Sequence, residues 1–206
     1  MERIKRELNL AYSPSVYISP NEVGIANRCV SFVPVLTSGH YVGDVIHKNA
    51  NFIIPLTQQE NTITDVNLAV QADSGQTVWQ DYPDTLPTNV ATFKSQTPKA
   101  PLSVSFADAF DPPAPIFSKE GRGNRYTLLH QRQVRFCLQG DKLLRAEKTG
   151  SDWLPAPGIL MLSNLTSNSE FSSYDDPLQL LVMSLSLQTQ DGELVLPSQI
   201  QVAYEP

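Results

Sequence analysis

The last thirty residues alternate apolar and polar side chains in two runs that flank the dipeptide Asp191-Gly192. A period of two is typical of a half-buried β-strand, and an Asp-Gly step between two such runs is a strong signal for a hairpin turn. We therefore expect a long hairpin at the end of the chain. Pro197 lacks an amide hydrogen, which predicts that the returning strand lies at a sheet edge or carries a bulge. The alternating apolar residues are Leu181, Met183, Leu185, Leu187, Ile200, Val202 and Tyr204.

The composition also favours a β-rich chain with many short strands. Among 206 residues there are 16 prolines and 10 glycines, while charged residues make up 17%, below the usual ~25%. Residues 134–146 repeat the hairpin pattern around Gly140-Asp141, and residues 28–36 form a further alternating run. Residues 73–125 contain many prolines and one strand-like run, at 102–106, so we expect mostly long loops there. One β-rich domain fits this pattern best.

The amino terminus has a different period. Met1, Ile4, Leu8 and Ala11 recur at spacings of three and four, which is one stripe of an α-helix, and the intervening residues are mostly charged. Pro14 ends the helix, because proline disfavours the α conformation in the residue before it. We therefore predict a helix over residues 1–13 with its apolar stripe packed on the strands. The expected fold class is α+β, with this helix against a largely antiparallel sheet.

Charge and hydropathy exclude two classes of partner. The net charge of −6 and the pI near 5.0 provide no basic field for nucleic acid, so no nucleic-acid partner is expected. No apolar run of about 18 residues is present, and the first residues lack the layout of a signal peptide. A chain that opens in the middle of a helical pattern also fits a protein from which a targeting segment has been removed.

Two cysteines, Cys29 and Cys137, each lie in a strand-like run. No histidine or second cysteine stands at metal-ligand spacing from either one. We expect a disulfide between them, which requires an extracytoplasmic location. The alternative is a pair of buried free thiols, since cysteine is a common small core residue.

The sequence offers no convincing catalytic, metal or cofactor site. His40 and His47 flank Asp44, but their spacing of seven fits no standard ligand pair, so a strand or loop surface is the better interpretation. No Gly-x-Ser-x-Gly elbow occurs, and residues 120–125 lack the lysine and hydroxyl of a phosphate-binding loop. We therefore expect no catalytic residue, no metal ligand, no cofactor and no enzyme activity.

Two weaker binding hypotheses stay open. The acidic pairs Asp108 with Asp111 and Asp175 with Asp176 suit turns better than calcium, which needs about six to eight oxygen ligands. Trp79, Tyr82 and Trp153 are candidates for a sugar-stacking platform, although aromatic side chains more often fill cores. A secreted carbohydrate-binding or adhesive β-sandwich module is therefore the alternative function.

Four stretches together resemble the minor pilins of type IV pilus-like systems, in particular the MshO-like minor pilins of the mannose-sensitive haemagglutinin pilus. PilW-type and GspJ-type minor pilins share the architecture. In that group a helix runs into a proline and a strand, a cysteine-containing strand follows, and a second cysteine strand and a closing hairpin come later. Here the corresponding stretches are ERIKRELNLAYSPSVYI, NRCVSFVPV, VRFCLQGDKLLR and LSLQTQDGELVLPSQIQV. Residues 73–125 carry nothing that matches the group.

The resemblance implies a structural subunit that assists pilus assembly or forms part of the tip, with a pseudopilin of a type II secretion system as a related alternative. Residues 1–13 would be the outer part of the pilin helix and residues 14–206 the head. Ile4, Leu8 and Ala11 would be the packing residues. Its partners would be other major and minor pilins. The protein would face the periplasm or cell surface, held in the inner membrane only by a preceding apolar helix, and the isolated head would be a monomer or weak dimer.

Overall fold

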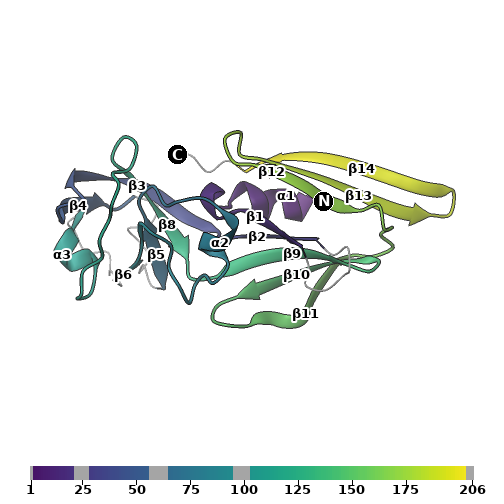
Figure 1. Cartoon of the computed structure of the whole chain (residues 1–206), viewed down its shortest axis with the longest axis horizontal. Helices are drawn as coiled ribbons and strands as arrows, with labels where there is room; N and C mark the ends of the chain where they lie inside the picture. The colour runs from purple at the N-terminus through teal and green to yellow at the C-terminus, as the bar shows by residue number, and fades with distance from the viewer. Residues whose placement is uncertain (1, 21–27, 56–64, 95–102, 203–206) are drawn as a thin grey trace. The chain divides into compact units, whose positions relative to one another are not determined.

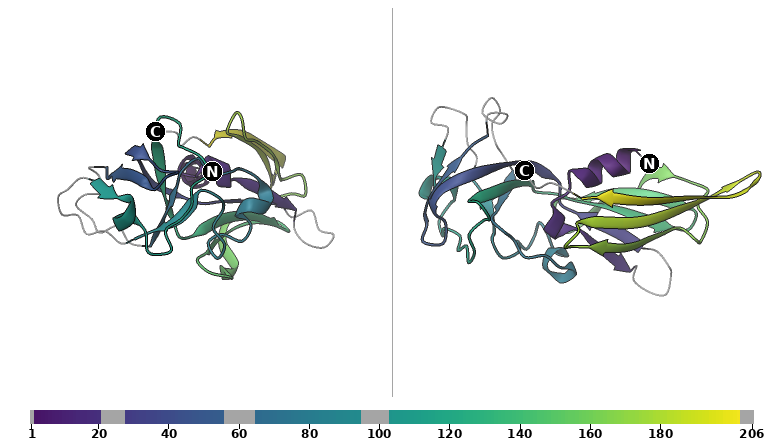
Figure 2. Two further views of the ribbon diagram at one scale, coloured as in Figure 1. Left: turned by 60° about the vertical axis from the view of Figure 1, so that its left-hand side comes forward. Right: turned by 90° about the horizontal axis from the view of Figure 1, so that it is seen from above.

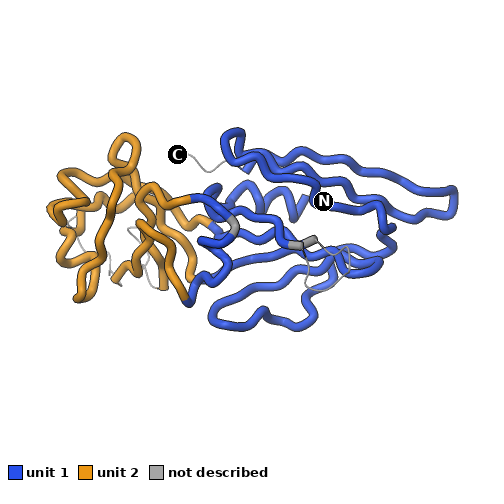
Figure 3. Tube along the Cα trace, in the orientation of Figure 1, with its two compact units in different colours: residues 1–34, 74–84, 132–205 blue, residues 35–73, 85–131, 206 orange. Residues whose placement is uncertain are grey.

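A computed structural model describes residues 2–20, 28–55, 65–94 and 103–202. The chain forms two compact units (Figure 3). Unit 1 comprises residues 1–34, 74–84 and 132–205, and unit 2 comprises residues 35–73 and 85–131. The sequence pattern had indicated a single head over residues 14–206; the structure instead builds separate sheets and cores in the two units.

Unit 1 contains two antiparallel sheets (Figure 1). The five-stranded sheet has the order β1-β2-β9-β10-β11, and the three-stranded sheet has the order β12-β13-β14. The strands of the first are β1 (Tyr17–Pro20), β2 (Arg28–Phe32), β9 (Gln133–Gln139), β10 (Lys142–Lys148) and β11 (Trp153–Leu162). Those of the second are β12 (Glu170–Asp175), β13 (Leu180–Thr189) and β14 (Gly192–Gln201), and a short helix, α2 (Gln76–Trp79), also belongs to this unit.

The hairpins expected from alternation are confirmed. β13 pairs with β14 from Leu180↔Gln201 to Thr189↔Gly192, and β9 pairs with β10 along their whole length. β14 is the outer strand of its sheet, so Pro197 stands on an edge strand as its missing amide hydrogen requires. Tyr204 lies outside the described residues.

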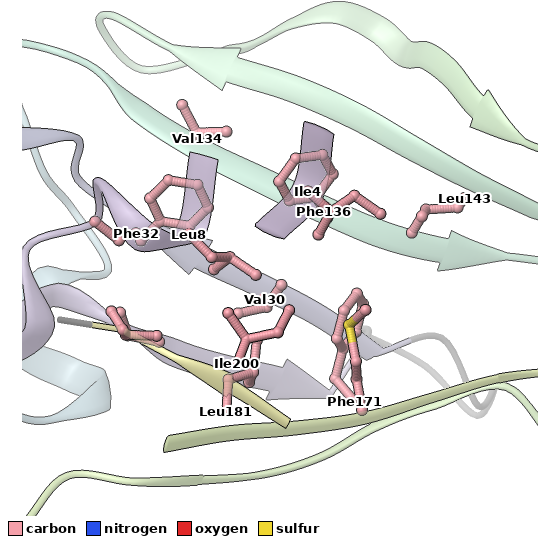
Figure 4. Packing of buried hydrophobic residues seen from close by; sticks show 14 of the residues in the cluster. Ile4, Leu8, Val30, Phe32, Val134, Phe136, Leu143, Phe171, Leu181 and Ile200 are labelled. Atoms are coloured by element: carbon pink, nitrogen blue, oxygen red, sulfur yellow. The ribbon is translucent and has the colours of Figure 1, made fainter. Parts of the chain in front are cut away.

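The amino-terminal helix α1 (Glu2–Asn9) supplies one part of the unit 1 core. Ile4 and Leu8 are 2% and 0% exposed, and Ala11 just beyond the helix is also fully buried. The close-up of this cluster shows Ile4 and Leu8 among side chains from both sheets (Figure 4). Their strand partners include Val30, Phe32, Val134, Phe136, Leu143, Phe171, Leu181 and Ile200. The three described members of the expected stripe, Ile4, Leu8 and Ala11, are therefore buried, whereas Met1 lies outside the described residues.

The expected α+β fold class is wrong, because the molecule is mainly β. Within the described ranges fourteen strands form three antiparallel sheets, and α1 is the one helix longer than a single turn. The helix expected over residues 1–13 ends at Asn9. The Tyr12 amide donates to the Val33 carbonyl, and Ala11 forms a β-bridge with Pro34. Strand-like pairing thus replaces the last helical turn, ahead of a 3₁₀ turn at Ser13–Ser15.

Unit 2 is built on a six-stranded antiparallel sheet with the order β6-β5-β8-β3-β4-β7. An aromatic cluster forms its core, with Phe52 in contact with the rings of Tyr41, Phe106, Phe110 and Tyr126. The elements are β3 (Val35–Asp44), β4 (Asn49–Ile53), β5 (Val66–Ala69), β6 (Val90–Phe93), β7 (Ser103–Ser105), α3 (Phe106–Ala109) and β8 (Arg125–His130).

The proline-rich stretch 73–125 holds more regular structure than the sequence indicated. It contributes α2, β6, β7 and α3. β6 is four residues long and follows shortly after Pro87, so it is too short to show a clear alternating pattern. Pairing with β5 on one side is what defines it as a strand.

Candidate functional site

The outward side of α1 is the most distinctive polar surface of unit 1. It lines an open hollow of about 750 Å³ whose walls are Glu2, Arg3, Lys5, Arg6, Asn9 and Leu10, which we call the α1 face. Three of these six residues are cations and one is an acid. Leu10 is 48% exposed and adds an apolar end to the hollow. The opposite side of the helix is buried, so the α1 face has a fixed orientation on the sheets.

An ionic network fixes α1 on the five-stranded sheet. The Arg145 guanidinium on β10 donates from Nε to Glu7 Oε2 at 2.8 Å and from an Nη atom to Glu147 Oε1 at 2.6 Å. On the helix itself, Arg3 Nε donates to Glu7 at 3.0 Å. Arg132 completes the network with a 3.1 Å bond to Glu147. Because Arg145 is buried, its charge depends on both carboxylates for compensation.

The pKa shifts in this network show which charge states the fold favours. Burial alone would lower the pKa of Arg145, but its hydrogen bonds to Glu7 and Glu147 outweigh burial and raise that pKa. Burial would likewise raise the pKa of Glu147, yet hydrogen bonding and charge from Arg145 and Arg132 hold it below its ordinary value. Both shifts favour the charged forms of Arg145 and Glu147 near neutral pH.

The segment after α1 is tied to both sheets by hydroxyl groups. Ser13 Oγ and the Tyr174 hydroxyl on β12 lie 2.7 Å apart, and Tyr174 also donates to the Ser13 carbonyl at 3.1 Å. Burial raises the pKa of Tyr174 to about 12, so its hydroxyl keeps its proton. Ser15 Oγ accepts from the Val33 amide at 2.9 Å. The exit of α1 is thus held as firmly as its packed side.

The two cysteines form a disulfide in the structure. Cys29 on β2 stands directly opposite Cys137 on β9, in neighbouring strands of the five-stranded sheet. The bond therefore joins two strands separated by 108 residues, between which all of unit 2 is inserted. Of the two states that the sequence left open, the structure contains the bridge.

The histidines do not form a site. His47 Nδ1 lies 2.7 Å from Asp44 Oδ2 in the exposed turn after β3, where the Asp44 hydrogen bond raises the pKa of His47. His40 is an exposed residue of β3 that pairs with Ile53, and His130 lies on β8. Across the residues that the structure describes, no group of three potential ligands is positioned to hold a metal ion.

The acidic pairs take roles in turns and caps. Asp108 accepts a hydrogen bond from Ser105, the residue that caps α3, and Asp111 pairs with Lys94 at 3.2 Å. Asp175 accepts from the Leu178 amide at 2.9 Å in the turn between β12 and β13.

The aromatic platform suggested by the sequence is not assembled. Trp79 and Tyr82 are 0% exposed and contact each other in the interior of unit 1 at a tilted angle, with ring centroids 5.6 Å apart. Trp153 is partly exposed, with the Arg135 guanidinium 4.2 Å from its ring centroid. Since two of the three rings are buried, they present no surface to a sugar.

The ionic network around Arg145 was not predicted from the sequence. The available signal was a charge inside an otherwise apolar run, Leu143-Leu144-Arg145-Ala146, in the second half of a predicted hairpin. A buried arginine needs a carboxylate partner, but Glu7 lies 138 residues away and no spacing rule connects them.

No family model matches the chain, and no curated protein or solved structure matches it either. Among the helices described, none is long and apolar enough to cross a membrane.

Proposed function

We propose that this chain is a structural subunit of a type IV pilus-like fibre, a minor pilin that acts by association with other subunits and has no catalytic role. The observation that carries the proposal is α1, whose apolar side is fixed in the core by Ile4 and Leu8 while its charged side stays open. A helix held in this way is a rigid element through which neighbouring subunits make contact. Within the proposal, other pilins are the partners.

The distribution of the resembling stretches supports the same proposal. Apart from Val35, the last residue of the second stretch, all four lie in unit 1, the unit that contains α1, the disulfide and the closing hairpin. Most of the stretch without resemblance, residues 85–125, lies in unit 2. Unit 1 would then be the assembly body of the subunit, and unit 2 an insertion that gives this subunit its own surface.

The disulfide supports an oxidising location. Disulfides persist in periplasmic and secreted proteins and are rare in the cytosol. We therefore propose that the folded chain faces the periplasm or the cell surface. In line with the resemblance, an apolar helix joined to the amino end of α1 would hold the subunit in the inner membrane before assembly.

Deletion and complementation in the source organism test this function. Deletion of the gene is expected to reduce the number of surface pili seen by electron microscopy, and the intact gene to restore it. A gene that encodes residues 1–206 behind a cleaved export signal should not restore piliation, because the exported head would lack the apolar helix that is proposed to hold the subunit in the membrane. Normal piliation with the exported head, together with strong binding of that head to immobilised glycans, would instead favour a diffusible carbohydrate-binding module.

A further inference from the structure

The positively charged residues are confined to the first three quarters of the chain. All 15 lysines and arginines precede Thr149, so residues 149–206 contain no cation to balance their acids. This part of the chain forms β11 and the whole three-stranded sheet. The acids in it are Asp152, Glu170, Asp175, Asp176, Asp191, Glu193 and Glu205. The three-stranded sheet is therefore an acidic surface in the same unit that carries the basic α1 face.

The turn of the β13–β14 hairpin combines acid and exposed apolar surface. Residues 190–195, which we call the hairpin tip, are all exposed and include Asp191 and Glu193. Leu194 is 49% and Val195 52% exposed, so two adjacent aliphatic side chains stand beside these acids. Thr166 and Asn168 donate to Glu193 at 2.7 and 2.9 Å, and these bonds lower the pKa of Glu193 and keep it charged.

The hairpin tip extends outward from unit 1. In two views the β13–β14 hairpin continues past the amino end of α1 (Figures 1 and 2). The buried part of the hairpin, around Leu181 and Ile200, packs in the core near α1. Because the tip is carried away from that core, the α1 face and the tip of one copy are displayed as separate surfaces.

The α1 face has the complementary chemistry. Arg3, Lys5 and Arg6 surround the hollow together with one acid, Glu2. Glu7, the other acid of the helix, bonds to Arg145 and to Arg3, so Lys5 and Arg6 are the cations left to outnumber Glu2. The hollow therefore has an excess of positive charge, and Leu10 provides an apolar contact beside it. An acidic turn that also carries exposed aliphatic side chains matches both features.

We propose that the hairpin tip of one copy docks in the α1 face of a second copy. Asp191 and Glu193 would face Arg3, Lys5 and Arg6, and Leu194 would cover Leu10. Because the two surfaces differ, the contact is heterologous and repeats head to tail, which generates a chain of subunits when it does not close into a ring. The proposal deepens the assembly role proposed above and rests on it for its biological purpose.

Sedimentation equilibrium of the purified chain over a concentration series tests this contact. We expect self-association at 20 mM NaCl that weakens by about tenfold or more at 500 mM NaCl, because salt screens exposed charge pairs. Replacing Asp191 and Glu193 by lysine should weaken association by a similar factor, on the order of tenfold. Lys5→Glu with Arg6→Glu should do the same. A chain carrying both sets of changes should associate again, since the α1 face then has three acids beside Arg3 and matches the lysine tip of the next copy.

The turn between β12 and β13 provides a matched control. Asp175 and Asp176 carry the same charge, and Leu178 beside them is 62% exposed. Asp175→Lys with Asp176→Lys should leave association unchanged. If this variant weakens association as strongly as the tip variant, the acidic sheet as a whole, and not the hairpin tip, makes the contact and the proposal is wrong.

Cross-linking locates the contact directly. Both native cysteines are in the disulfide, so an introduced cysteine is a single reactive thiol. An Arg6→Cys copy mixed with a differently tagged Asp191→Cys copy should form a mixed dimer with a short bismaleimide, whereas Lys142→Cys in place of Arg6→Cys should not. A chain that stays monomeric at every concentration and salt overturns the contact, while the piliation experiment still decides the assembly function.

Discussion

Truncation of Leu8 to alanine tests whether α1 is an integral part of the unit 1 core. Leu8 is 0% exposed and packs among strand residues of both sheets. Leu8→Ala removes three buried carbons and leaves a cavity, because strands held by ladders on both sides of the helix relax only partly. Such substitutions cost about 2–5 kcal/mol of unfolding free energy. We expect a value within this range, since the disulfide beside the core also restricts collapse around the cavity.

Tryptophan fluorescence during urea unfolding measures the loss of unfolding free energy in unit 1, where Leu8 lies. The chain has two tryptophans, Trp79 and Trp153, and both belong to unit 1. Arg6→Ala is the matched control on the exposed side of the same helix and should change the unfolding free energy by no more than about 0.5 kcal/mol. If Leu8→Ala is no more destabilising than Arg6→Ala, α1 is a peripheral segment and the assignment of a fixed α1 face fails.

Three further perturbations probe the rest of the structure. Thiol titration of unfolded, unreduced protein should find no free thiol, and two reactive thiols would refute the disulfide. Replacing both Cys29 and Cys137 by alanine should cost about 2–5 kcal/mol of unfolding free energy. Arg145→Met should cost about 1–3 kcal/mol at pH 7, because it leaves carboxylates without their partner. Against the effect of burial, hydrogen bonds and charge from Arg145 and Arg132 lower the folded-state pKa of Glu147 below its ordinary value. The stabilisation from this carboxylate is therefore complete above the ordinary glutamate pKa and is lost as the pH falls through the folded-state value. Urea titrations should show the mutant and native chains converging in acid, and a constant difference in unfolding free energy would contradict the ionic account. Gly43→Ala should destabilise unit 2 by about 1–3 kcal/mol in calorimetry, because Gly43 has a φ of +99° and a Cβ would meet a backbone oxygen at 2.1 Å. An unchanged unfolding transition would show that β3 accepts a side chain at this position without strain.

The parts of the fold that the sequence predicted are those specified by local pattern. The β13–β14 hairpin has a period of two on both sides of a tight turn, and its register places Leu181 opposite Ile200 as the alternation requires. The burial of Ile4 and Leu8 follows in the same way from helical spacing. In each case the residues that determine the element are neighbours in sequence, so one window contains the whole signal.

The parts that the sequence did not predict depend on distant partners. The last turn of the expected helix is lost because Tyr12 and Ala11 pair with residues 33 and 34, which no local window reveals. The separate core of unit 2 arises where strands from 35–53, 66–93 and 103–130 meet in one sheet. The short strands of unit 2 are stabilised by pairing with neighbouring strands and have no clear propensity signal of their own. Their contribution to the fold was therefore underestimated, and the predicted α+β class gave the helix too much weight.

The candidate site shows the same division. Charged residues on α1 were recognised from helical spacing, but the hollow that they line and the Arg145 network that orients them come from the fold. The hairpin tip was visible in sequence as a turn, whereas its projection beyond the core, with Leu194 and Val195 exposed, was not. The complementarity between the α1 face and the hairpin tip could therefore not be predicted from the sequence.

Immunogold labelling of pili sheared from the cell surface tests the assembly function most directly. An antibody raised against unit 2 recognises residues that are not part of α1. The account predicts labelling on the fibres, at or near their tips, in cells with the intact gene and none in the deletion strain. Abundant fibres that carry no label while the chain accumulates in the periplasmic or secreted fraction would contradict it.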